Sequence, residues 1–195
     1  MQTTKVKTTQ DNRLCQGDIL RDVFWLEHVN EEAGVIEVAR IVFPLAIVLT
    51  QDCDLEQDHR FRNEPRSTQD KWLMSVLMAP LYNVEHVYQG EHLSQLDIRM
   101  ETVPKSGNTG KFLRNNERPR YHYLEFDDGV PIVPSVIDFK HYFSATVTYL
   151  MRIKPAAYVC SVAPLFREDI AQRFASYLAR VGLPELGASA VTRVE

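Results

Sequence analysis

The sequence feature that most constrains the fold is the stretch that follows Pro44, residues 45–50, which reads Leu-Ala-Ile-Val-Leu-Thr. Successive side chains of a β-strand point to opposite faces of a sheet, so a strand with apolar residues at nearly every position is apolar on both faces. Such a strand is stable only where other parts of the chain cover both faces. We therefore predict that this stretch is a central strand of a sheet.

Further strand-like runs lie on both sides of this stretch. Residues 23–26 and 35–38 are rich in β-branched and aromatic side chains, and the polar run between them ends in Gly34, which is typical of a hairpin. A strand is also expected at 72–79, ending before Pro80 because proline cannot donate to a sheet ladder. Similar runs occur at 121–126, 136–143 and 157–162, with turns expected at 127–129 and 154–155.

Two segments have the periodicity of helices. Leu93, Leu96, Met100 and Val103 recur at the spacing of one helical face, and Pro104 would end that helix. The second helix begins at Pro164, where proline suits the first turn, and ends near Gly182. The apolar residues along one face of this C-terminal helix are Ile170, Phe174, Leu178 and Val181.

The remaining segments are expected to be irregular. Residues 1–13 are polar and predict a flexible N-terminal arm, and residues 185–195 predict a C-terminal tail. Residues 51–70 carry six acids and three arginines with little to bury, which predicts a long exposed loop. Residues 105–120 carry five basic residues and one acid, with two glycines, which predicts a mobile basic loop.

This order of elements predicts a mainly β fold with added helices. We expect a single domain over residues 14–184, built as an SH3-like, partly open barrel with an inserted helical segment at about 83–120 and a helix at its C-terminal end. A parallel α/β sheet is disfavoured, because the chain lacks the helices that would have to alternate with its strands.

Composition limits the classes of function. The net charge is −4, from 22 basic and 26 acidic residues, which is not the strongly basic balance of a protein that coats DNA. The three cysteines are widely spaced and form no CxxC motif, so neither a disulfide framework nor a zinc ribbon is expected. The N-terminus lacks the apolar core of a secretion signal, and no apolar run approaches the ~20 residues of a membrane span. The expectation is a cytoplasmic protein with no membrane partner.

Several short strings, in this order along the chain, resemble the MazF/PemK family of toxin endoribonucleases, which has an SH3-like barrel. Residues 17–20, Gly-Asp-Ile-Leu, are similar to the opening motif of the family. Residues 44–50, Pro-Leu-Ala-Ile-Val-Leu-Thr, resemble its central strand, and residues 78–83, Met-Ala-Pro-Leu-Tyr-Asn, resemble its second proline segment. Residues 137–139, Ile-Asp-Phe, fall where the family has an Asp-containing strand.

The residues on which cleavage in that family depends are not retained. Phe43 stands where the family has an arginine before the strand proline, and Tyr82 stands where it has a hydroxyl residue after the second proline. The resemblance therefore implies a nucleic-acid-associated bacterial protein of toxin-antitoxin or defence type, as an altered or inactive ribonuclease that cleaves phosphodiesters if it is an enzyme. The alternative is a non-catalytic protein-interaction module of a multi-subunit bacterial assembly, with another protein or a second copy as its partner.

The string Gln-Asp-Cys-Asp at 51–54 is the first candidate for chemistry. If the strand continues to residue 54, Asp52 and Asp54 share one face and could hold a divalent cation such as Mg²⁺, or divide into acid and base. The alternative is an Asp-rich turn in which Asp52 accepts backbone N–H groups. Cys53 is a poor candidate for a nucleophile, because two flanking carboxylates disfavour its thiolate.

The basic segment at 105–123 is the second candidate. Cations that neutralise phosphates, combined with aromatic rings that stack on bases, are typical of sites for single-stranded RNA. The candidate residues for such a site are Lys111, Phe112, Arg114, Arg118, Arg120, Tyr121 and Tyr123. The alternative is a solvated loop whose tyrosines alternate onto one face of a strand. If the chain is catalytic, we expect phosphodiester cleavage at a mouth formed by residues 51–54, Tyr82 and residues 111–123, with Asp52, Asp54 and Tyr82 as the catalytic residues.

Overall fold

The structure is a computed structural model of the chain and describes residues 3–64 and 68–180. Its strands are β1 (Val6–Lys7), β2 (Asp18–Glu32), β3 (Val35–Val48), β4 (Ser75–Asn83), β5 (Tyr121–Leu124), β6 (Ser135–Asp138), β7 (Phe143–Thr146) and β8 (Tyr158–Val162). Its α-helices are α1 (Asp52–Arg62), α2 (Val84–Gln89), α3 (Gly107–Arg114), α4 (Val147–Ala157) and α5 (Pro164–Leu178). Two 3₁₀ turns, η1 (Ser94–Leu96) and η2 (Phe139–His141), connect other elements.

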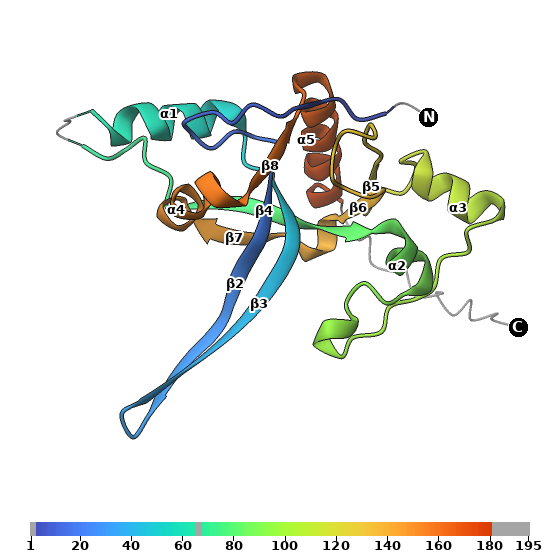
Figure 1. Cartoon of the computed structure of the whole chain (residues 1–195), viewed down its shortest axis with the longest axis horizontal. Coiled ribbons are helices and arrows are strands. Elements are labelled where there is room, and N and C mark those ends of the chain that lie inside the picture. The colour runs from blue at the N-terminus through green and yellow to red at the C-terminus, as the bar shows by residue number, and fades with distance from the viewer. Residues whose placement is uncertain (1–2, 65–67, 181–195) are drawn as a thin grey trace, which may run out of the picture.

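The strands of the described residues form one antiparallel sheet in the order β1-β8-β2-β3-β4-β6-β5, and β7 also pairs with β4. The sheet curls into a half-barrel, and helices lie around it (Figure 1). The predicted class, mainly β with added helices and a partly open barrel, is confirmed.

The stretch predicted to be a central strand includes the inner end of β3, residues 45–48. Residues 46–48 pair with β4, and residues 45–47 pair with β2 on the other side. Ala46 and Val48 pack into one hydrophobic cluster, whereas Ile47 and Leu49 pack into another. The alternation of side chains along a strand therefore buries both faces, as the sequence indicates.

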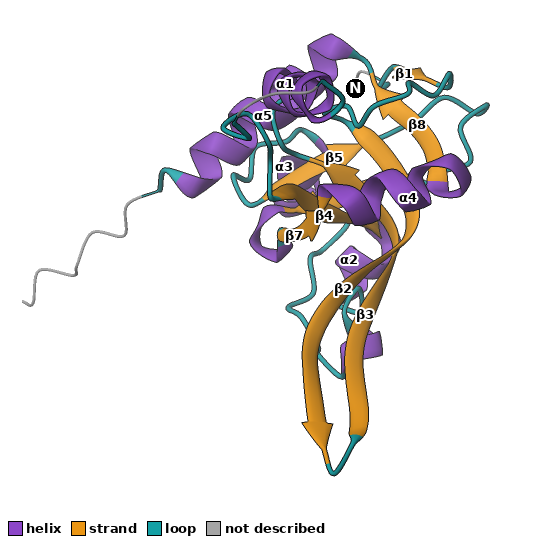
Figure 2. Cartoon of the chain, turned by 90° about the vertical axis from the view of Figure 1, so that its left-hand side faces the viewer, coloured by secondary structure: helices purple, strands orange, loops and turns teal. Residues whose placement is uncertain are grey.

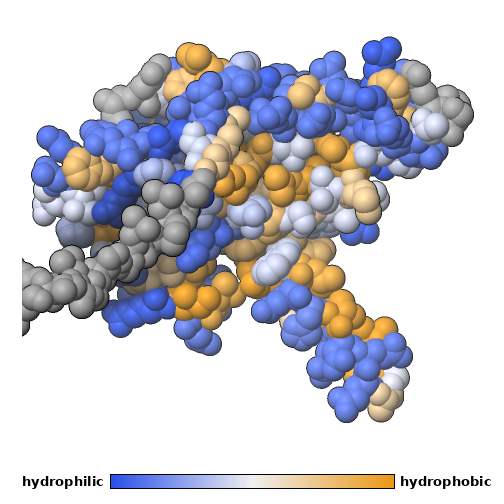
Figure 3. Space-filling model, turned by 180° about the vertical axis from the view of Figure 1, so that it is seen from behind, coloured by the Kyte–Doolittle hydropathy of each residue, from blue (hydrophilic) through white to orange (hydrophobic). Residues whose placement is uncertain are grey.

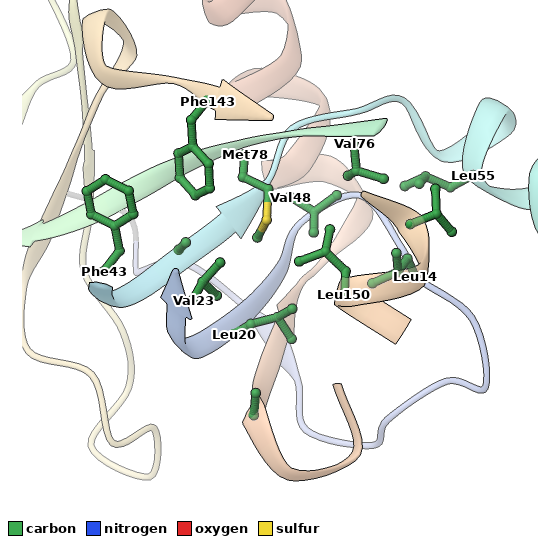
Figure 4. Packing of buried hydrophobic residues seen from close by; sticks show 13 residues of the cluster. Leu14, Leu20, Val23, Phe43, Val48, Leu55, Val76, Met78, Phe143 and Leu150 are labelled. Atoms are coloured by element: carbon green, nitrogen blue, oxygen red, sulfur yellow. The ribbon is translucent and has the colours of Figure 1, made fainter. Parts of the chain in front are cut away.

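The cluster on one face of the sheet is covered by α4. Leu150 of α4 is fully buried against Leu20, Val48 and Met78 of the strands (Figure 4). Because interiors are close-packed, removing such a leucine side chain costs about 2–5 kcal/mol. This contact fixes α4, which leads directly into β8.

The opposite face is covered by the C-terminal helix. α5 begins at Pro164, as predicted, and buries Ile170 and Phe174 against the cluster that holds Ile47 and Phe139. Leu178, which the helical pattern assigns to the same face, is half exposed. The predicted exit at Gly182 and the tail at 185–195 lie outside the described residues.

The hairpin expected around Gly34 is present and is much longer than the sequence suggests. β2 and β3 join through Ala33 and Gly34, which both have positive φ (52° and 80°), as in the tight turns that suit twisted hairpins. β8 pairs with β2 only at residues 18–20, and β4 pairs with β3 only at residues 46–48. Residues 21–45, called the projecting hairpin below, therefore pair only with each other among the described strands; their base, with Val23 and Phe43, packs into the core, and the rest extends away from the body (Figures 1 and 2).

The expectation of a long loop at 51–70 is wrong, because residues 52–62 form α1. The hydrophobic pattern misses this helix since Leu55 and Asp58 are the buried residues on it. Charge placement favours it instead: acids lie in its first turn and bases in its last, which suits the helix dipole. Arg62 also pairs with Asp58 one turn before it, at 2.7 Å.

Two expectations for the inserted segment are also corrected. The helix expected at 93–103 is reduced to the short turn η1, and the helix of this region is α2, which precedes it. Gly90 ends α2 with φ of 72°, and a Cβ there would lie 2.2 Å from the carbonyl oxygen of Met100. Part of the expected basic loop forms α3, which buries Leu113.

The positions of the prolines and turns differ from expectation. β4 does not end before Pro80 but continues through it, because its outer partner changes there from β7, paired up to Met78, to β6, paired from Leu81. The strand expected at 136–143 is divided by η2 into β6 and β7. Pro155, expected in a turn, lies in the last turn of α4.

The segment expected to be a flexible N-terminal arm contains β1, an edge strand of the sheet. β1 pairs with β8, and Thr4 forms a parallel bridge with Phe126. Among the described helices, none is long and apolar enough to span a membrane.

Candidate functional site

Side chains from four separate segments meet beside the end of β4. Tyr82 lies near the end of β4, Asp138 ends β6, His141 ends η2, and His92 follows α2. Arg120 immediately precedes β5 and joins the same cluster. β6 pairs with both β4 and β5, which brings these segments together although they are far apart in the sequence.

Asp138 is the centre of the cluster and is fully buried. Arg120 donates two hydrogen bonds to its carboxylate, at 2.8 and 2.5 Å, and the backbone N–H of Lys140 donates a third at 3.0 Å. The bidentate geometry is the strongest that an arginine forms with a carboxylate. A charge at Asp138 is thus compensated within the protein and fixes the guanidinium of Arg120.

His141 contacts both Asp138 and Tyr82 through one ring nitrogen. Its Nδ1 lies 3.4 Å from Oδ2 of Asp138 and 3.2 Å from the hydroxyl oxygen of Tyr82. The direction of the hydrogen bond with Tyr82 depends on the tautomer of the ring. In the tautomer that places the proton on Nδ1, beside the carboxylate, Nε2 is the nitrogen that can accept a proton. Burial lowers the pKa of His141 below its ordinary value, against the opposing charge of Asp138, so the ring is mainly neutral at pH 7.

The ring of His92 lies beside those of Tyr82 and His141. Its ring centre lies 4.8 Å from that of Tyr82 and 6.1 Å from that of His141. Neither ring nitrogen makes a well-aligned hydrogen bond within the described part of the chain, although both are buried, and the nearby backbone of His86 opposes the effect of burial on the pKa. Burial lowers the pKa of His92 and raises that of Tyr82, so both groups favour their neutral forms. Unpartnered buried polar atoms are rare and are characteristic of sites that meet a ligand.

A cleft opens beside these groups. It consists of two adjoining hollows of about 350 and 540 Å³, of which the first is lined by His92 and the second by His141 and Lys140. Tyr82 lines both hollows. The residues that also line both are Ile41, Phe43, Leu93 and Leu96. The cleft thus lies between the base of the projecting hairpin and the segment around η1, with polar groups at its centre and apolar walls.

The same cluster includes the ligand set of a metal site. One ligand atom each from His92, Asp138 and His141 lies within 4.8 Å of the others. Two imidazoles and a carboxylate are a common set for zinc or non-haem iron. Arg120 already occupies both carboxylate oxygens, so a metal ion would have to compete with a guanidinium for Asp138. Proton transfer is the chemistry that this arrangement supports without rearrangement.

The structure separates the two aspartates of the 51–54 string. Helix α1 begins at Asp52, so Asp52 and Asp54 do not share the face that a strand would give them. Asp52 accepts two hydrogen bonds from Arg13, both at 3.0 Å, and one from the backbone N–H of Gln16 at 3.1 Å. Arg167 of α5 lies 3.3 Å from it. Asp52 therefore connects α1 to α5 and to the N-terminal segment. Burial raises its pKa, but the hydrogen bonds from Arg13 and Gln16 outweigh this effect, so the pKa lies below its ordinary value.

Asp54 and Cys53 are exposed on α1. The thiol of Cys53 lies 3.8 Å from a carboxylate oxygen of Asp54. The expected cation site at Asp52 and Asp54 does not form in the described structure, where the metal-like cluster is the one around Asp138. Tyr82, the third expected catalytic residue, lies with that cluster rather than with the aspartates.

The structure also separates the residues of the basic segment, some of which are buried or bound to other side chains. Tyr121 and Tyr123 are buried in the cluster that holds Leu113, so they present no face to a base, and Arg120 is bound to Asp138. Arg114 is half-buried and donates to the hydroxyl of Tyr88 at 3.2 Å.

Two residues of the expected RNA-binding set are exposed, and its three arginines are half-buried. Lys111 and Phe112 are exposed on α3, and Arg118 is half-buried in the turn before β5. α3 packs into the same hydrophobic cluster as Tyr82, so these residues lie at the same end of the molecule as the cleft.

Sequence reasoning missed His92 and His141 as site residues and treated Asp138 as part of a strand motif. His92 lies 46 positions before Asp138, and no spacing rule connects them. The one local signal is the separation of Asp138 and His141 by three residues, which becomes meaningful only because η2 turns the chain between them.

The chain was compared with protein-family models, with curated proteins and with solved structures. No family model matches it, and neither a curated protein nor a solved structure matches it either.

Proposed function

We propose that this protein binds single-stranded RNA in the cleft beside Tyr82 and cleaves phosphodiester bonds there by acid–base catalysis. The observation that carries the proposal is the pair of histidines around Tyr82, one oriented by a buried carboxylate and the other with both nitrogens unpartnered. An oriented imidazole is suited to accept a proton and a second one to donate a proton. The resemblance to toxin endoribonucleases, with its implied role in toxin or defence systems, points to the same class of substrate.

The roles of the residues follow from their contacts. His141, held through Nδ1 by Asp138, takes the proton of a ribose 2′-hydroxyl at Nε2. The 2′-oxygen then attacks phosphorus, and the bond from phosphorus to the 5′-oxygen breaks. His92, in the molecules in which its ring is protonated, gives a proton to the leaving 5′-oxygen, and the product carries a 2′,3′-cyclic phosphate. The neutral hydroxyl of Tyr82 is placed to donate to the phosphate oxygens as their charge grows.

The walls of the cleft suit a nucleic acid. Trp25 and Tyr142 contribute exposed aromatic surface on which a base can stack, and Lys140 contributes a cation near the phosphate. Lys111 and Phe112 on α3 offer a further cation and ring for a strand that leaves the cleft. The net charge of −4 confines such binding to this end of the molecule.

The test is cleavage of an end-labelled single-stranded RNA, with the matching DNA and 2′-O-methyl RNA as controls. Both controls should stay intact, because neither has a free 2′-hydroxyl. We expect His141→Gln to lower the rate by about 10²–10⁴, the usual contribution of a general base. The matched control is His59→Gln in α1, outside the cleft, which should cleave at the wild-type rate.

Two results would refute this mechanism. The first is the absence of RNA cleavage in both EDTA and added divalent cations. The second is cleavage by His141→Gln at the rate of His59→Gln. A rate that rises steeply with added zinc and disappears in EDTA would instead favour the metal-ion arrangement of the same three residues.

The second candidate function, a protein-interaction module, is favoured by a different observation. The projecting hairpin exposes several large apolar side chains away from the cleft. Loss of RNA binding in low salt, combined with stable association through this hairpin, would favour it over the enzyme.

A further inference from the structure

The two strands of the projecting hairpin are partners only of each other over residues 21–45 within the described chain. At about 3.3 Å per residue, the longer strand extends roughly 40 Å. A two-stranded ribbon is marginally stable in water, and both of its outer edges here are unpaired within the described structure. A ribbon of this length is therefore expected to gain stability from a surface that covers it.

The register of the hairpin divides its side chains into two unlike faces. Residues that are partners in an antiparallel pair lie on the same face, and successive pairs alternate, with one shift at a bulge between Leu26 and His28. One face carries Phe24, Leu26, Val29, Glu31, Ile36, Val38, Arg40 and Val42. Beyond the bulge, the other carries His28, Asn30, Glu32, Val35, Glu37 and Ala39. The first is called the apolar face below.

Beyond Phe24, whose ring packs against Tyr149 of α4, the apolar face is open to solvent. Val29, Val38 and Ile36 are 55%, 55% and 65% exposed, and Leu26 and Val42 are nearly as open. Figure 3 shows hydrophobic surface along one side of the projecting hairpin and hydrophilic surface beside it. Contiguous apolar surface of this kind marks an interaction site. The central pair, Val29 and Val38, does not line the cleft.

Charge indicates which partner covers it. Glu31 and Arg40 are the two charged residues in register on the apolar face, and they lie on opposite sides of the Val29–Val38 pair. Glu31 is two residues towards the tip, and Arg40 is two residues towards the base. A two-fold rotation about the central pair reverses the direction of the ribbon. It therefore brings Glu31 of each copy to the level of Arg40 of the other.

The rest of the projecting hairpin argues against phosphate-bearing partners. Its distal part carries Glu27, Glu32 and Glu37 in addition to Glu31, and these acids repel both RNA and anionic lipid. We propose that the projecting hairpin is the interface of a homodimer, in which the apolar faces of two copies pack antiparallel about the Val29–Val38 pair. Such a contact is isologous and closes after two copies.

The experiment measures the association of the full chain by sedimentation equilibrium over a range of concentrations. We expect the wild-type protein to dimerise and Val38→Asp to remain monomeric. We also expect Glu31→Arg and Arg40→Glu each to weaken the dimer about tenfold, because each places like charges opposite one another at two symmetric positions. The matched control is Glu37→Arg on the opposite face, which should dimerise as the wild type does.

The decisive variant is the double exchange Glu31→Arg with Arg40→Glu. An antiparallel homodimer regains its opposite charges in this variant, so its dissociation constant should return to within about threefold of the wild-type value. Far-UV circular dichroism and thermal melting of each variant confirm that the body remains folded. A wild-type protein that stays monomeric at the highest concentration, or a double exchange that fails to restore the dimer, overturns the proposal. Neither outcome depends on whether the protein cleaves RNA.

Discussion

A buried ion pair gives the sharpest prediction about stability. Asp18, at the start of β2, is fully buried, and Lys154 of α4 is 2% exposed. Nζ of Lys154 donates to Oδ2 of Asp18 at 2.7 Å and also to the backbone carbonyl of Arg13. Asp18 further accepts from the backbone N–H of Cys15 at 3.0 Å and from the hydroxyl of Ser161. The pair thus connects the N-terminal segment, the sheet and α4.

We predict that Lys154→Met is strongly destabilising. The methionine fills a similar volume, but it leaves the carboxylate of Asp18 buried without its counter-charge. Breaking a buried pair in this way costs about 3–5 kcal/mol. For a chain of 195 residues, at roughly 2–4 °C per kcal/mol, the melting temperature should fall by about 6–20 °C.

The assay is urea unfolding, followed by fluorescence and circular dichroism, together with thermal melting. The matched control is Lys5→Met, which removes the lysine of an exposed pair with Asp127, at 2.9 Å. Exposed pairs contribute about 0–1 kcal/mol, so this variant should unfold almost as the wild type does.

A double variant separates the cost of an unpaired charge from the contribution of the pair. Asp18→Asn with Lys154→Met has neither charge, and replacing both members of a buried pair is often close to neutral. We expect it to recover most of the stability lost in Lys154→Met. The reasoning about burial of this charge is refuted by either of two results. The first is that Lys154→Met is no less stable than Lys5→Met. The second is that the double variant has no higher free energy of unfolding than Lys154→Met.

Three further predictions follow from the site and its surroundings. Burial lowers the pKa values of His92 and His141, and cleavage needs one protonated and one neutral ring. The rate of RNA cleavage should therefore be maximal below pH 6.5, and a maximum above pH 7.5 would contradict these roles. Burial lowers the pKa of His122 to about 3, so as the pH falls the unfolded chain takes up a proton at His122 before the folded chain does. The free energy of unfolding should therefore fall by about 1.4 kcal/mol per pH unit below 6.5. Urea titrations of His122→Gln should lack this slope. Asp52→Asn should cost about 1–3 kcal/mol in the same assay, because two arginines lose their partner, whereas the exposed Asp54→Asn should stay within about 0.5 kcal/mol; equal losses would refute the structural role given to Asp52.

The local sequence pattern was sufficient to predict those elements in which burial or a tight turn restricts the residue types. The run at 45–50 is apolar on both faces, and its residues 45–48 are the inner end of β3. Gly34 marks the hairpin, and Pro164 with Ile170 and Phe174 marks α5. In each of these cases burial or a backbone turn dictates residue type within a few positions, so the sequence alone is sufficient.

Tertiary structure decided the elements that lack such a pattern. α1 has few apolar residues, and its place depends on Asp58 and on the contacts of Asp52 with Arg13 and Arg167. Those partners lie 39 residues before Asp52 and 115 after it, so local spacing contains no trace of them. For the same reason, the string at 51–54, which suggests a cation site in the sequence, instead connects α1 to α5 and the N-terminal segment through Asp52.

The candidate site was also decided by tertiary structure. Tyr82, His92, Arg120 and the Asp138–His141 segment meet because β6 pairs with β4 on one side and β5 on the other. Each of these residues alone resembles an ordinary surface or strand residue in the sequence. Their burial together changes the preferred protonation of the histidines, and burial is a property of the packed chain rather than of any short stretch of it.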